Sequence, residues 1–384
     1  MKGGATMIKS HKIRLYPNKE QKLLLMRYCG AYRFVYNYML ELTEKEYNDH
    51  KQHLSTFDLI NKLVQLKRSD EYQWLNDISA FTLQQACMDL NKAYKLYFNK
   101  KCNVPQFKSK KKKNMFCTRA SRLKFYDEKL LKIEKIGTIK YKSDFDFKLF
   151  RDGNIKNARI AYDNNKWMLT FSIESENQAY ELNEYRMGID LGIKDLAIVA
   201  YDDKNIIFHN INKSQKMKKL NKRLLYIQRK LSRKYEANKI KGKYFKSKKI
   251  LKEEDKLKKT CLKMHNIRNN YIHQVTHNIV AQYPKSITIE DLNVKGMMKN
   301  RHLSKAVQQQ CFGEFRRQIE YKCEKFGIEL RVADRFYPSS KTCSNCGCIK
   351  SDLRLSDRTY HCNECGFIID RDLNAAINLS KYMI

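Results

Sequence analysis

The sequence predicts two parts: an α/β layer around a mixed β-sheet in the second half, and a smaller β-rich part with a helical insertion in the first half. In the second half, apolar strand-like runs and helical stretches follow one another as strand, strand, helices, strand, helix, strand and helix, the order of an α/β layer. In the first half, short runs of apolar residues flank a long helical region. The 384 residues are enough for two or three domains.

The first half begins with a strand-like segment at 11–16, which Pro17 separates from helical sequence. Asn18 and Gln21 have the spacing of a capping box at the start of this helical sequence. We therefore expect residues 17–100 to form an inserted helical module. The flanking residues, 1–16 and 101–183, are expected to form a small β-barrel, with strands near 137–141, 158–161 and 167–173.

The second half begins near residue 184 and contains the elements of the predicted sheet. A strongly basic helical stretch at 214–282 has few apolar residues in its middle, at 239–249, so we expect two antiparallel helices joined by a loop. A cysteine-rich segment at 337–366 interrupts this half, which leaves 184–336 and 367–384 as one domain. The other expected elements are strands at 187–201, 206–211, 286–290 and 328–333, and helices at 303–325 and from Asp372 onward.

The composition indicates a polyanionic partner. The chain has 77 Lys and Arg against 41 Asp and Glu, a net charge of +36, and 24 Tyr and 18 Phe are interleaved with the basic residues. Such a charge opposes compaction unless a polyanion offsets it, and aromatic rings suit a partner that offers base faces as well as phosphates. The alternative is that an AT-rich genome, in which lysine codons are abundant, accounts for the basic composition. The excess of basic over acidic residues is too large for that explanation alone.

The sequence contains no apolar run of the roughly 18 to 20 residues that a membrane span needs, and no signal-peptide core follows Met1. We therefore expect an intracellular protein without a membrane partner, in which the 12 cysteines are reduced.

A run of lysines at 108–113, interrupted by Ser109, follows Pro105. Such a run is usually a solvated, mobile loop. Contact with phosphate is the functional alternative, and a nuclear-localisation signal is a weaker one.

Two cysteine pairs have the spacing of zinc ligands. Each pair has two residues between its members, a glycine follows each pair, and 15 residues separate the pairs. One tight turn can present both sulfurs of such a pair to a metal, whereas disulfides are disfavoured in a reducing compartment. Four thiolates leave no open coordination position, so we expect one structural Zn²⁺, with Cys348 and His361 as spare residues. The expected ligands are Cys343, Cys346, Cys362 and Cys365.

Three acidic positions are candidates for a second metal site. Asp190 lies in an apolar strand between Gly188 and Gly192, and Glu290 ends another strand. Burying a carboxylate among apolar side chains costs several kcal/mol unless a cation or hydrogen bonds compensate. The flanking glycines would let a metal or a phosphate approach the backbone.

The third position lies at the start of the last helix, where Asp370 and Asp372 precede an alanine-rich stretch. Three carboxylates from separate elements can bridge two Mg²⁺ ions about 4 Å apart, which activate water and stabilise the leaving oxygen in phosphodiester hydrolysis. Each acid also has a plain structural interpretation, for example Asp372 as a helix N-cap. Their order, with the cysteine pairs directly before the third acid, is more specific.

Four segments together resemble the TnpB family, the OrfB-type proteins of bacterial and archaeal insertion sequences that are related to type V CRISPR effectors. The opening and a short segment after the helical region also look like the family, whereas Met1 to Thr6 do not fit its usual start and Met7 is an alternative initiator. The four segments are GIDLG at 188–192, IEDL at 289–292, PSSKTCSNCG at 338–347 and CGFIIDRDLNAA at 365–376; the others are KIRLYPN at 12–18 and FKSK at 107–110.

The resemblance implies an RNase H-like, RuvC-type nuclease core with an inserted Cys₄ zinc ribbon, preceded by a wedge barrel that carries a helical recognition module. By motif position, the catalytic residues and magnesium ligands are Asp190, Glu290 and Asp372, the last chosen over Asp370 because it lies two residues before Asn-Ala. Asp195 and Asp291 fall outside the matched positions, and we expect them to be turn or solvent-facing residues.

The resemblance also implies the partners. A guide RNA transcribed from the end of the element would direct cleavage of matching double-stranded DNA beside a short motif. We expect a monomer with its RNA in the bacterial or archaeal cytoplasm, associated with the nucleoid. Two alternatives stay open: a transposase or recombinase that needs no RNA, and a guide-loaded repressor that does not cut, which the three intact acids disfavour.

Overall fold

The computed structural model describes residues 6–111, 114–143, 145, 154–176, 180–240, 242–354 and 356–383. The chain divides into two compact units, residues 1–176 and 177–384. The division precedes the boundary at 183/184 that the sequence suggested, and the first strand of the second unit starts at Asn183. None of the described helices is both long and apolar enough to cross a membrane.

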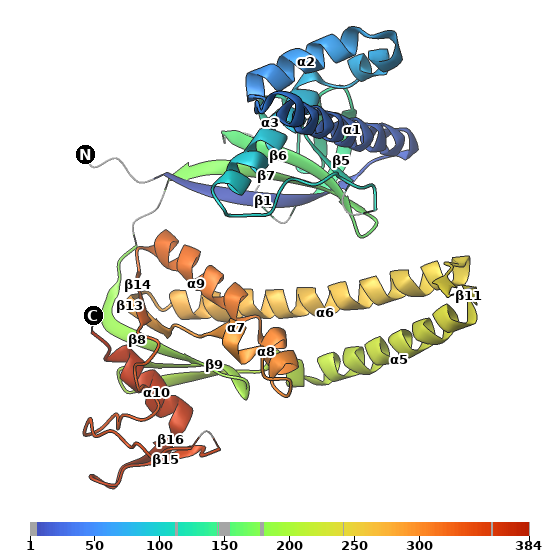
Figure 1. The fold of residues 1–384 in the computed structure, drawn as a ribbon. Coiled ribbons are helices and arrows are strands. Elements are labelled where there is room, and N and C mark those ends of the chain that lie inside the picture. The colour runs from blue at the N-terminus through green and yellow to red at the C-terminus, as the bar shows by residue number, and fades with distance from the viewer. Residues whose placement is uncertain are drawn as a thin grey trace, which may run out of the picture. The chain divides into compact units, whose positions relative to one another are not determined.

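The first unit consists of a β-sheet with three α-helices on one face (Figure 1). The sheet has seven strands in the order β2-β6-β7-β1-β5-β4-β3, and neighbouring strands are antiparallel. These strands were expected to form a barrel. In the described residues they pair as a sheet with β2 at one edge and β3 at the other. The strands are β1 (Thr6–Tyr16), β2 (Asn114–Cys117), β3 (Lys124–Phe125), β4 (Leu130–Ile133), β5 (Gly137–Lys142), β6 (Ile155–Asp163) and β7 (Lys166–Glu176); the helices are α1 (Lys19–His50), α2 (Thr56–Arg68) and α3 (Ala80–Phe98), with 3-10 turns at Asp70–Asp77 and Ala120–Arg122.

The capping box expected at the start of α1 is present. The Gln21 backbone N–H donates to Asn18 Oδ1 at 2.8 Å, and the Asn18 N–H donates to Gln21 Oε1 at 3.0 Å. The helices then pack on the sheet through buried residues such as Tyr28 and Leu83, which share a core with Phe116 of β2. Local capping and an apolar helix face therefore both fix where the helical insertion begins.

The lysine run after Pro105 is held at its start. The Lys108 backbone exchanges hydrogen bonds with the Asn37 side chain of α1 at 2.7 and 3.0 Å, and its ammonium group lies over the Tyr36 ring. Burial lowers the pKa of Lys108 to about 8. The expectation of a solvated loop is thus wrong for Lys108, whereas Lys110 and Lys111 are exposed, and Lys112 and Lys113 lie outside the described residues.

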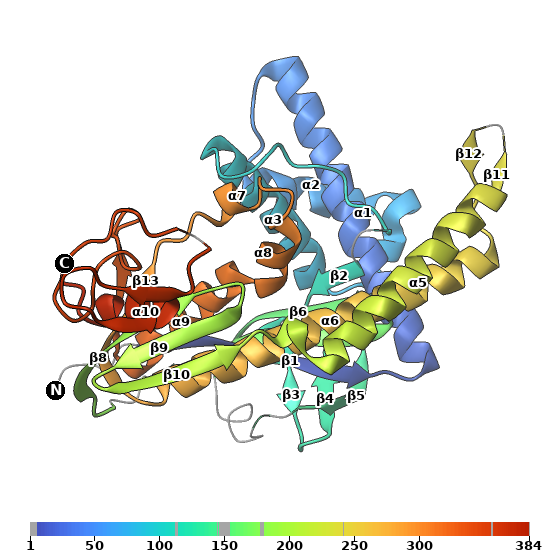
Figure 2. The same ribbon diagram turned by 90° about the horizontal axis from the view of Figure 1, so that it is seen from below.

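The second unit is built on a five-stranded mixed sheet with the order β10-β9-β8-β13-β14. The central strand β8 (Asn183–Leu191) runs parallel to β13 (Pro284–Glu290), which runs parallel to β14 (Glu329–Ala333). On the other side, β9 (Asp195–Tyr201) and β10 (Lys204–His209) complete an antiparallel hairpin pair (Figure 2). The run 187–201, expected to be one strand, is therefore two strands with a turn between them.

The helices of this unit include a long hairpin that projects from the sheet, with a small β-ribbon at its far end (Figures 1 and 2). The helix expected at 303–325 is broken at Cys311, whose φ of 56° is left-handed. The bounds are 3-10 turn Ile211–Lys213, α5 (Gln215–Ala237), β11 (Lys239–Ile240), β12 (Lys243–Tyr244), α6 (Lys248–Val280), α7 (Val294–Met297), α8 (Ser304–Gln310), α9 (Phe312–Phe326), β15 (Thr359–His361), β16 (Ile368–Asp370) and α10 (Arg371–Ser380).

The two faces of the mixed sheet are covered by different helices. Ile189 and Ile289 belong to a core that includes residues of α6 and α9. On the other face, Ile198 and Ala200 of β9 pack against Ala376 of α10. Figure 1 shows α9 and α10 on opposite sides of the strands. Because side chains alternate along a strand, the residues next to Ile189 and Ile289 point toward α10.

Gly188 is the point where α10 touches the sheet. A Cβ at Gly188 would lie 2.0 Å from the Ala376 carbonyl oxygen and 2.3 Å from the Ser380 backbone nitrogen. The backbone of α10 therefore occupies the space that a side chain at position 188 would take. The expectation that Gly188 leaves room for a metal or a phosphate is wrong.

We predict that Gly188→Ala lowers the stability of the second unit by about 1 to 3 kcal/mol or more, because α10 must move to admit a methyl group. The matched control is Gly313→Ala in α9, where a Cβ meets nothing within 4 Å and alanine should stabilise the helix by about 0.5 to 1 kcal/mol. Both tryptophans, Trp74 and Trp167, lie in the first unit, so the measurement is calorimetry rather than tryptophan fluorescence. Equal stability of the two variants would contradict the close contact.

Candidate active site and zinc ribbon

The strand register brings Asp190 and Glu290 together. Thr288 is aligned with Gly188, and Ile289 with Ile189, across the parallel pair β8–β13. The next residue on each strand is Glu290 and Asp190, and aligned residues of parallel strands point to the same face. Both carboxylates therefore point to the face that α10 covers. Both are partly buried.

Asp372 reaches the same place from α10. It lies in the first turn of this helix, four residues before Ala376, whose carbonyl oxygen is against Gly188. Asp372 thus lies about one helical turn from the contact between Ala376 and Gly188. Asp190 lies two residues from the same contact along β8. The three acids that the family motifs single out are brought together at one end of the sheet.

The electrostatics of the acids confirm their proximity. Burial raises the pKa of Asp190 well above its ordinary value, and the negative charges of Glu290 and Asp372 raise it further. Burial and Asp372 also raise the pKa of Glu290, against a hydrogen bond from Ser339 that lowers it. The Arg371 guanidinium offsets only part of this effect on Asp190. A divalent cation would supply further positive charge beside Asp190 and Glu290.

Asp370 takes the capping role that was the alternative for Asp372. The Asp370 Oδ1 atom accepts the backbone N–H groups of Asp372 at 3.0 Å and Leu373 at 3.2 Å. The Asp372 carboxylate instead accepts from Arg371 Nε at 3.1 Å and Nη2 at 2.8 Å, and Arg358 Nη1 lies 3.9 Å from its other oxygen. Asp370 rather than Asp372 is thus the N-cap of α10, and the Asp372 side chain is only 15% exposed.

Three polar residues of the site were not singled out from the sequence. Ser339 Oγ donates to Glu290 Oε1 at 2.6 Å. The Asn378 amide donates to the carbonyls of Ser339 at 2.8 Å and Thr342 at 2.7 Å, and the Asn374 amide donates to the Thr342 carbonyl at 2.7 Å. Ser339, Asn374 and Asn378 are all buried. They attach the segment before the first cysteine pair to α10 and orient Glu290.

The two acids outside the family motifs are not simply solvent-facing. Asp195, at the start of β9, lies 2.8 Å from His209 Nδ1 and is 15% exposed. Asp291 is ion-paired with Arg316 at 3.1 Å and with Arg335, and the hydrogen bond from Arg335 lowers its pKa. The expectation is therefore wrong for Asp195, which belongs to β9 and is largely buried, whereas Asp291 lies directly after β13 and is 32% exposed.

The four cysteines form a compact cluster at the ribbon β15–β16. Their sulfur atoms all lie within 4.8 Å of one another, with Cys343 and Cys365 at 3.7 Å and Cys346 and Cys362 at 3.6 Å. Tetrahedral zinc with bonds of about 2.3 Å requires sulfur atoms about 3.8 Å apart, so the cluster fits zinc. No disulfide joins the described cysteines.

The glycine after each cysteine pair has a left-handed backbone conformation. Gly347 and Gly366 have φ values of 80° and 70°, and their N–H groups donate to the carbonyls of Cys343 and Cys362 at 2.9 and 3.1 Å. Left-handed φ suits glycine, so each pair sits on a tight turn. The antiparallel pairing of β15 with β16 continues to Asp370, so the ribbon extends beyond the expected end at residue 366.

The acids form a looser group than the cysteines. Among the described residues, only the cysteine set has all its ligand atoms within 4.8 Å. The donor types nevertheless suit magnesium, which prefers carboxylate oxygens, and burial together with the neighbouring acids raises the pKa of both Asp190 and Glu290. The residues present therefore fit a magnesium site at this end of the sheet.

The fold is similar to that of a solved Cas12f1 protein. The chain superposes on the Cas12f1 protein of a complex with single guide RNA and target DNA with a TM-score of 0.62, at 14% identity, covering 98% of this chain and 99% of that one. Two curated relatives are named "Putative RNA-guided DNA endonuclease". The protein from Streptomyces pristinaespiralis is 28% identical, and the match covers 97% of this chain and 88% of the relative. InsQ of Escherichia coli is 27% identical, and the match covers 97% of this chain and 91% of InsQ.

Three family models match successive parts of the chain. They are the helix-turn-helix domain of OrfB_IS605 at 7–52, the OrfB_IS605 "Probable transposase" at 170–301, and the Cas12f1-like TNB domain at 312–379. Residues 7–52 form β1 and the single helix α1, so the first description does not match the local fold. Together with the relatives, these matches support the assignment of the chain to the TnpB family.

We predict that Asp190→Asn stabilises the metal-free protein at pH 7.5 by about 1 to 3 kcal/mol, because it removes a buried charge that lacks a partner. A raised pKa means that ionisation favours the unfolded chain, so this penalty grows as pH rises from about 4 through the raised pKa. Calorimetry should show that Mg²⁺ raises the unfolding temperature of the wild type and hardly changes that of the variant.

The matched control for Asp190→Asn is Asp291→Asn. Arginines lower the pKa of Asp291, so its loss should destabilise the protein, most clearly above its ordinary pKa. Destabilisation by Asp190→Asn at pH 7.5 would contradict the absence of a compensating charge.

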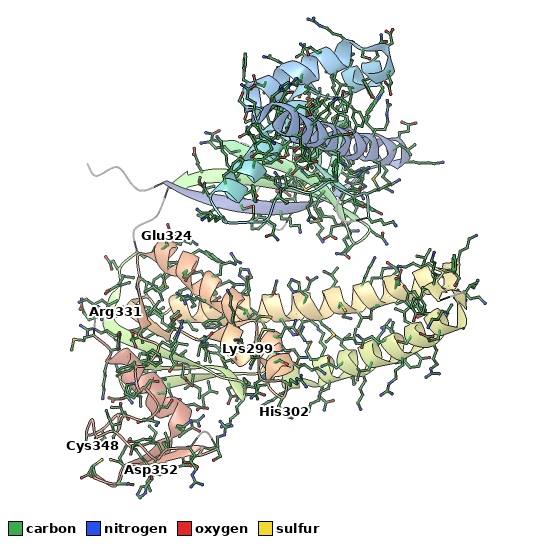
Figure 3. The ribbon with its side chains drawn as sticks, in the orientation of Figure 1. Lys299, His302, Glu324, Arg331, Cys348 and Asp352 are labelled. Carbon is green, nitrogen blue, oxygen red and sulfur yellow. The ribbon has the colours of Figure 1, made fainter. Side chains whose placement is uncertain are left out.

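We predict one zinc ion per chain, which Cys362→Ser should remove, with loss of ribbon structure. The control is Cys348→Ser, because Cys348 lies outside the cluster on the outer part of the ribbon (Figure 3). Zinc content by atomic emission measures the outcome. Full zinc content in Cys362→Ser, or its loss in Cys348→Ser, would overturn the ligand set.

Proposed function

We propose that the protein is an RNA-guided DNA endonuclease of a transposable element, which cuts guide-matched double-stranded DNA beside a short adjacent motif. The observation that carries the proposal is the convergence of Asp190, Glu290 and Asp372, from β8, β13 and α10, on one face of the sheet. The names of the relatives and the Cas12f1 fold support the same activity.

The three carboxylates would hold two Mg²⁺ ions, which supply an activated water and stabilise the leaving oxygen of a phosphodiester. The chain itself prepares the carboxylates. Ser339 fixes one oxygen of Glu290, Asp370 caps α10 so that Asp372 stays available, and Arg371 balances the Asp372 charge. In this assignment residues 184–336 and 367–384 are the RuvC domain, and residues 337–366 are the zinc ribbon, whose strand β15 pairs with β16 at the start of the last RuvC segment.

The basic surface of the hairpin α5–α6 would bind nucleic acid in this function. The hairpin carries closely spaced lysines and arginines on its exposed sides, and it projects from the sheet (Figure 1). A guide–target heteroduplex is bound through its backbone, while base pairing selects the sequence. We propose that this hairpin, with the helical module at 17–100, contacts the heteroduplex.

We predict that the protein purified with RNA from its element cuts a matched plasmid in Mg²⁺, and that Asp190→Ala lowers the rate at least about 100-fold, since the metals supply several kcal/mol of transition-state stabilisation. The control is Asp352→Ala, an exposed acid of the ribbon (Figure 3), which should cut normally.

The same assay separates the alternatives. Cutting that survives ribonuclease treatment would indicate a transposase or recombinase without a guide. Guide-dependent binding of the plasmid without any cutting would indicate a repressor. Persistent guide-dependent cutting by Asp190→Ala would show that the chosen acids are wrong.

A further inference from the structure

A hollow of about 150 Å³ opens beside Glu290, where β13 and β14 end. Glu290 at the end of β13 and Asp291 directly after it line one side of the hollow. Arg335 and Tyr337, from the segment after β14, line the other side. One candidate catalytic acid thus shares a depression with an arginine that no family motif assigned.

Arg335 is aligned by a neighbouring ion-pair network. Asp291 pairs with both Arg335 and Arg316, and Arg316 also pairs with Glu320 at 2.9 Å. Arg316 is therefore engaged on two sides and holds Asp291 in place. Arg335 has Asp291 as its ion-pair partner and stays 49% exposed, so a guanidinium with five N–H donors is oriented at the rim of the hollow.

The residue after Arg335 is the most exposed large apolar side chain of the described residues. Phe336 is 87% exposed. Both ends of its turn are anchored: the Asp334 N–H donates to the Tyr382 hydroxyl at 3.2 Å, and the Tyr337 hydroxyl donates to the Asn378 carbonyl at 3.3 Å. Asp334 also accepts the Phe336 N–H at 2.8 Å. An anchored turn therefore presents an apolar ring to solvent next to an oriented guanidinium.

Such a pair suits one ligand. A guanidinium binds phosphate through parallel N–H groups, and an exposed ring gains free energy when a nucleobase stacks on it. In a duplex the base faces are already stacked, so only a single strand offers both groups at once.

We propose that Arg335 and Phe336 form a binding site for the single strand that enters the nuclease centre, with Arg335 on a backbone phosphate and Phe336 stacked on a base. The proposal rests on the proposed function for the identity of the strand as DNA about to be cut. Arg335 and Phe336 are positioning residues, because they orient the strand toward Glu290.

The test uses the full-length chain, purified with its RNA, and a fluorescent reporter at the site. Both natural tryptophans lie in the first unit, so Phe336→Trp places a single tryptophan in the second. A 12-nucleotide oligodeoxythymidylate, without added divalent metal, should quench this tryptophan saturably. Ile349→Trp, an exposed position on the ribbon, is the matched control and should not respond.

The phosphate contact is tested by adding Arg335→Ala to Phe336→Trp. Affinity should fall, and the slope of log affinity against log salt should decrease by about 0.7, as one lost phosphate contact requires for a single strand. Arg317→Ala, on the same helix as Arg316 and 59% exposed, removes one charge elsewhere and should leave the slope unchanged. A 12-base-pair duplex should quench weakly.

Cleavage supplies an independent measurement. Arg335→Ala and Phe336→Ala should each slow cutting of the matched plasmid by about 10-fold or more, while Mg²⁺ still raises their unfolding temperatures as it does for the wild type. Absent or equal quenching at positions 336 and 349, or duplex quenching equal to that by the single strand, overturns the site even if the wild type cuts. Specific quenching with no cutting by the wild type keeps the site and defeats the proposed function.

Discussion

The contact between the backbone of α10 and Gly188 determines the geometry of the candidate site. Because no side chain separates the helix from β8, the Ala376 carbonyl approaches the strand directly. Asp372 then lies one turn from the contact along the helix, and Asp190 lies two residues from it along the strand. Small residues such as Ala375 and Ala376 permit this approach, and both are completely buried. A bulkier residue at the contact would separate the acids as well as the elements.

The charges at the site oppose folding, and the surrounding structure offsets them. Asp190 and Glu290 lie where ionisation is unfavourable, as their raised pKa values show. Asp291, one residue beyond Glu290, is in the reverse situation because two arginines hold it. Two adjacent residues at the end of β13 thus differ in whether the charge of the carboxylate is compensated. The uncompensated ones suit cation binding, whereas the compensated one suits alignment of Arg335.

The sequence predicted the features that depend on local spacing. The cysteine cluster, the capping box of α1 and the order of the three acids follow from residue spacing and composition. The run 187–201 was expected to be one strand because apolar residues continue from β8 through Ile193 into β9, so hydrophobicity alone does not mark the turn between them. Likewise the break at Cys311 is a backbone conformation that non-glycine residues seldom adopt, and periodicity does not reveal it.

The roles of Ser339, Asn374 and Asn378 could not be predicted, because their partners are backbone carbonyls and a carboxylate brought close only by folding. In the folded chain they connect the segment before the first cysteine pair to the helix that carries the third acid. The amides of α10 hold the residues that lead into the first cysteine pair, and Ser339 of that segment holds Glu290. Zinc bound by the four cysteines would therefore order the carbonyls that the α10 amides contact, and through Ser339 it would help to position the Glu290 carboxylate of β13. Zinc without an open coordination position can in this way support chemistry in which it takes no part.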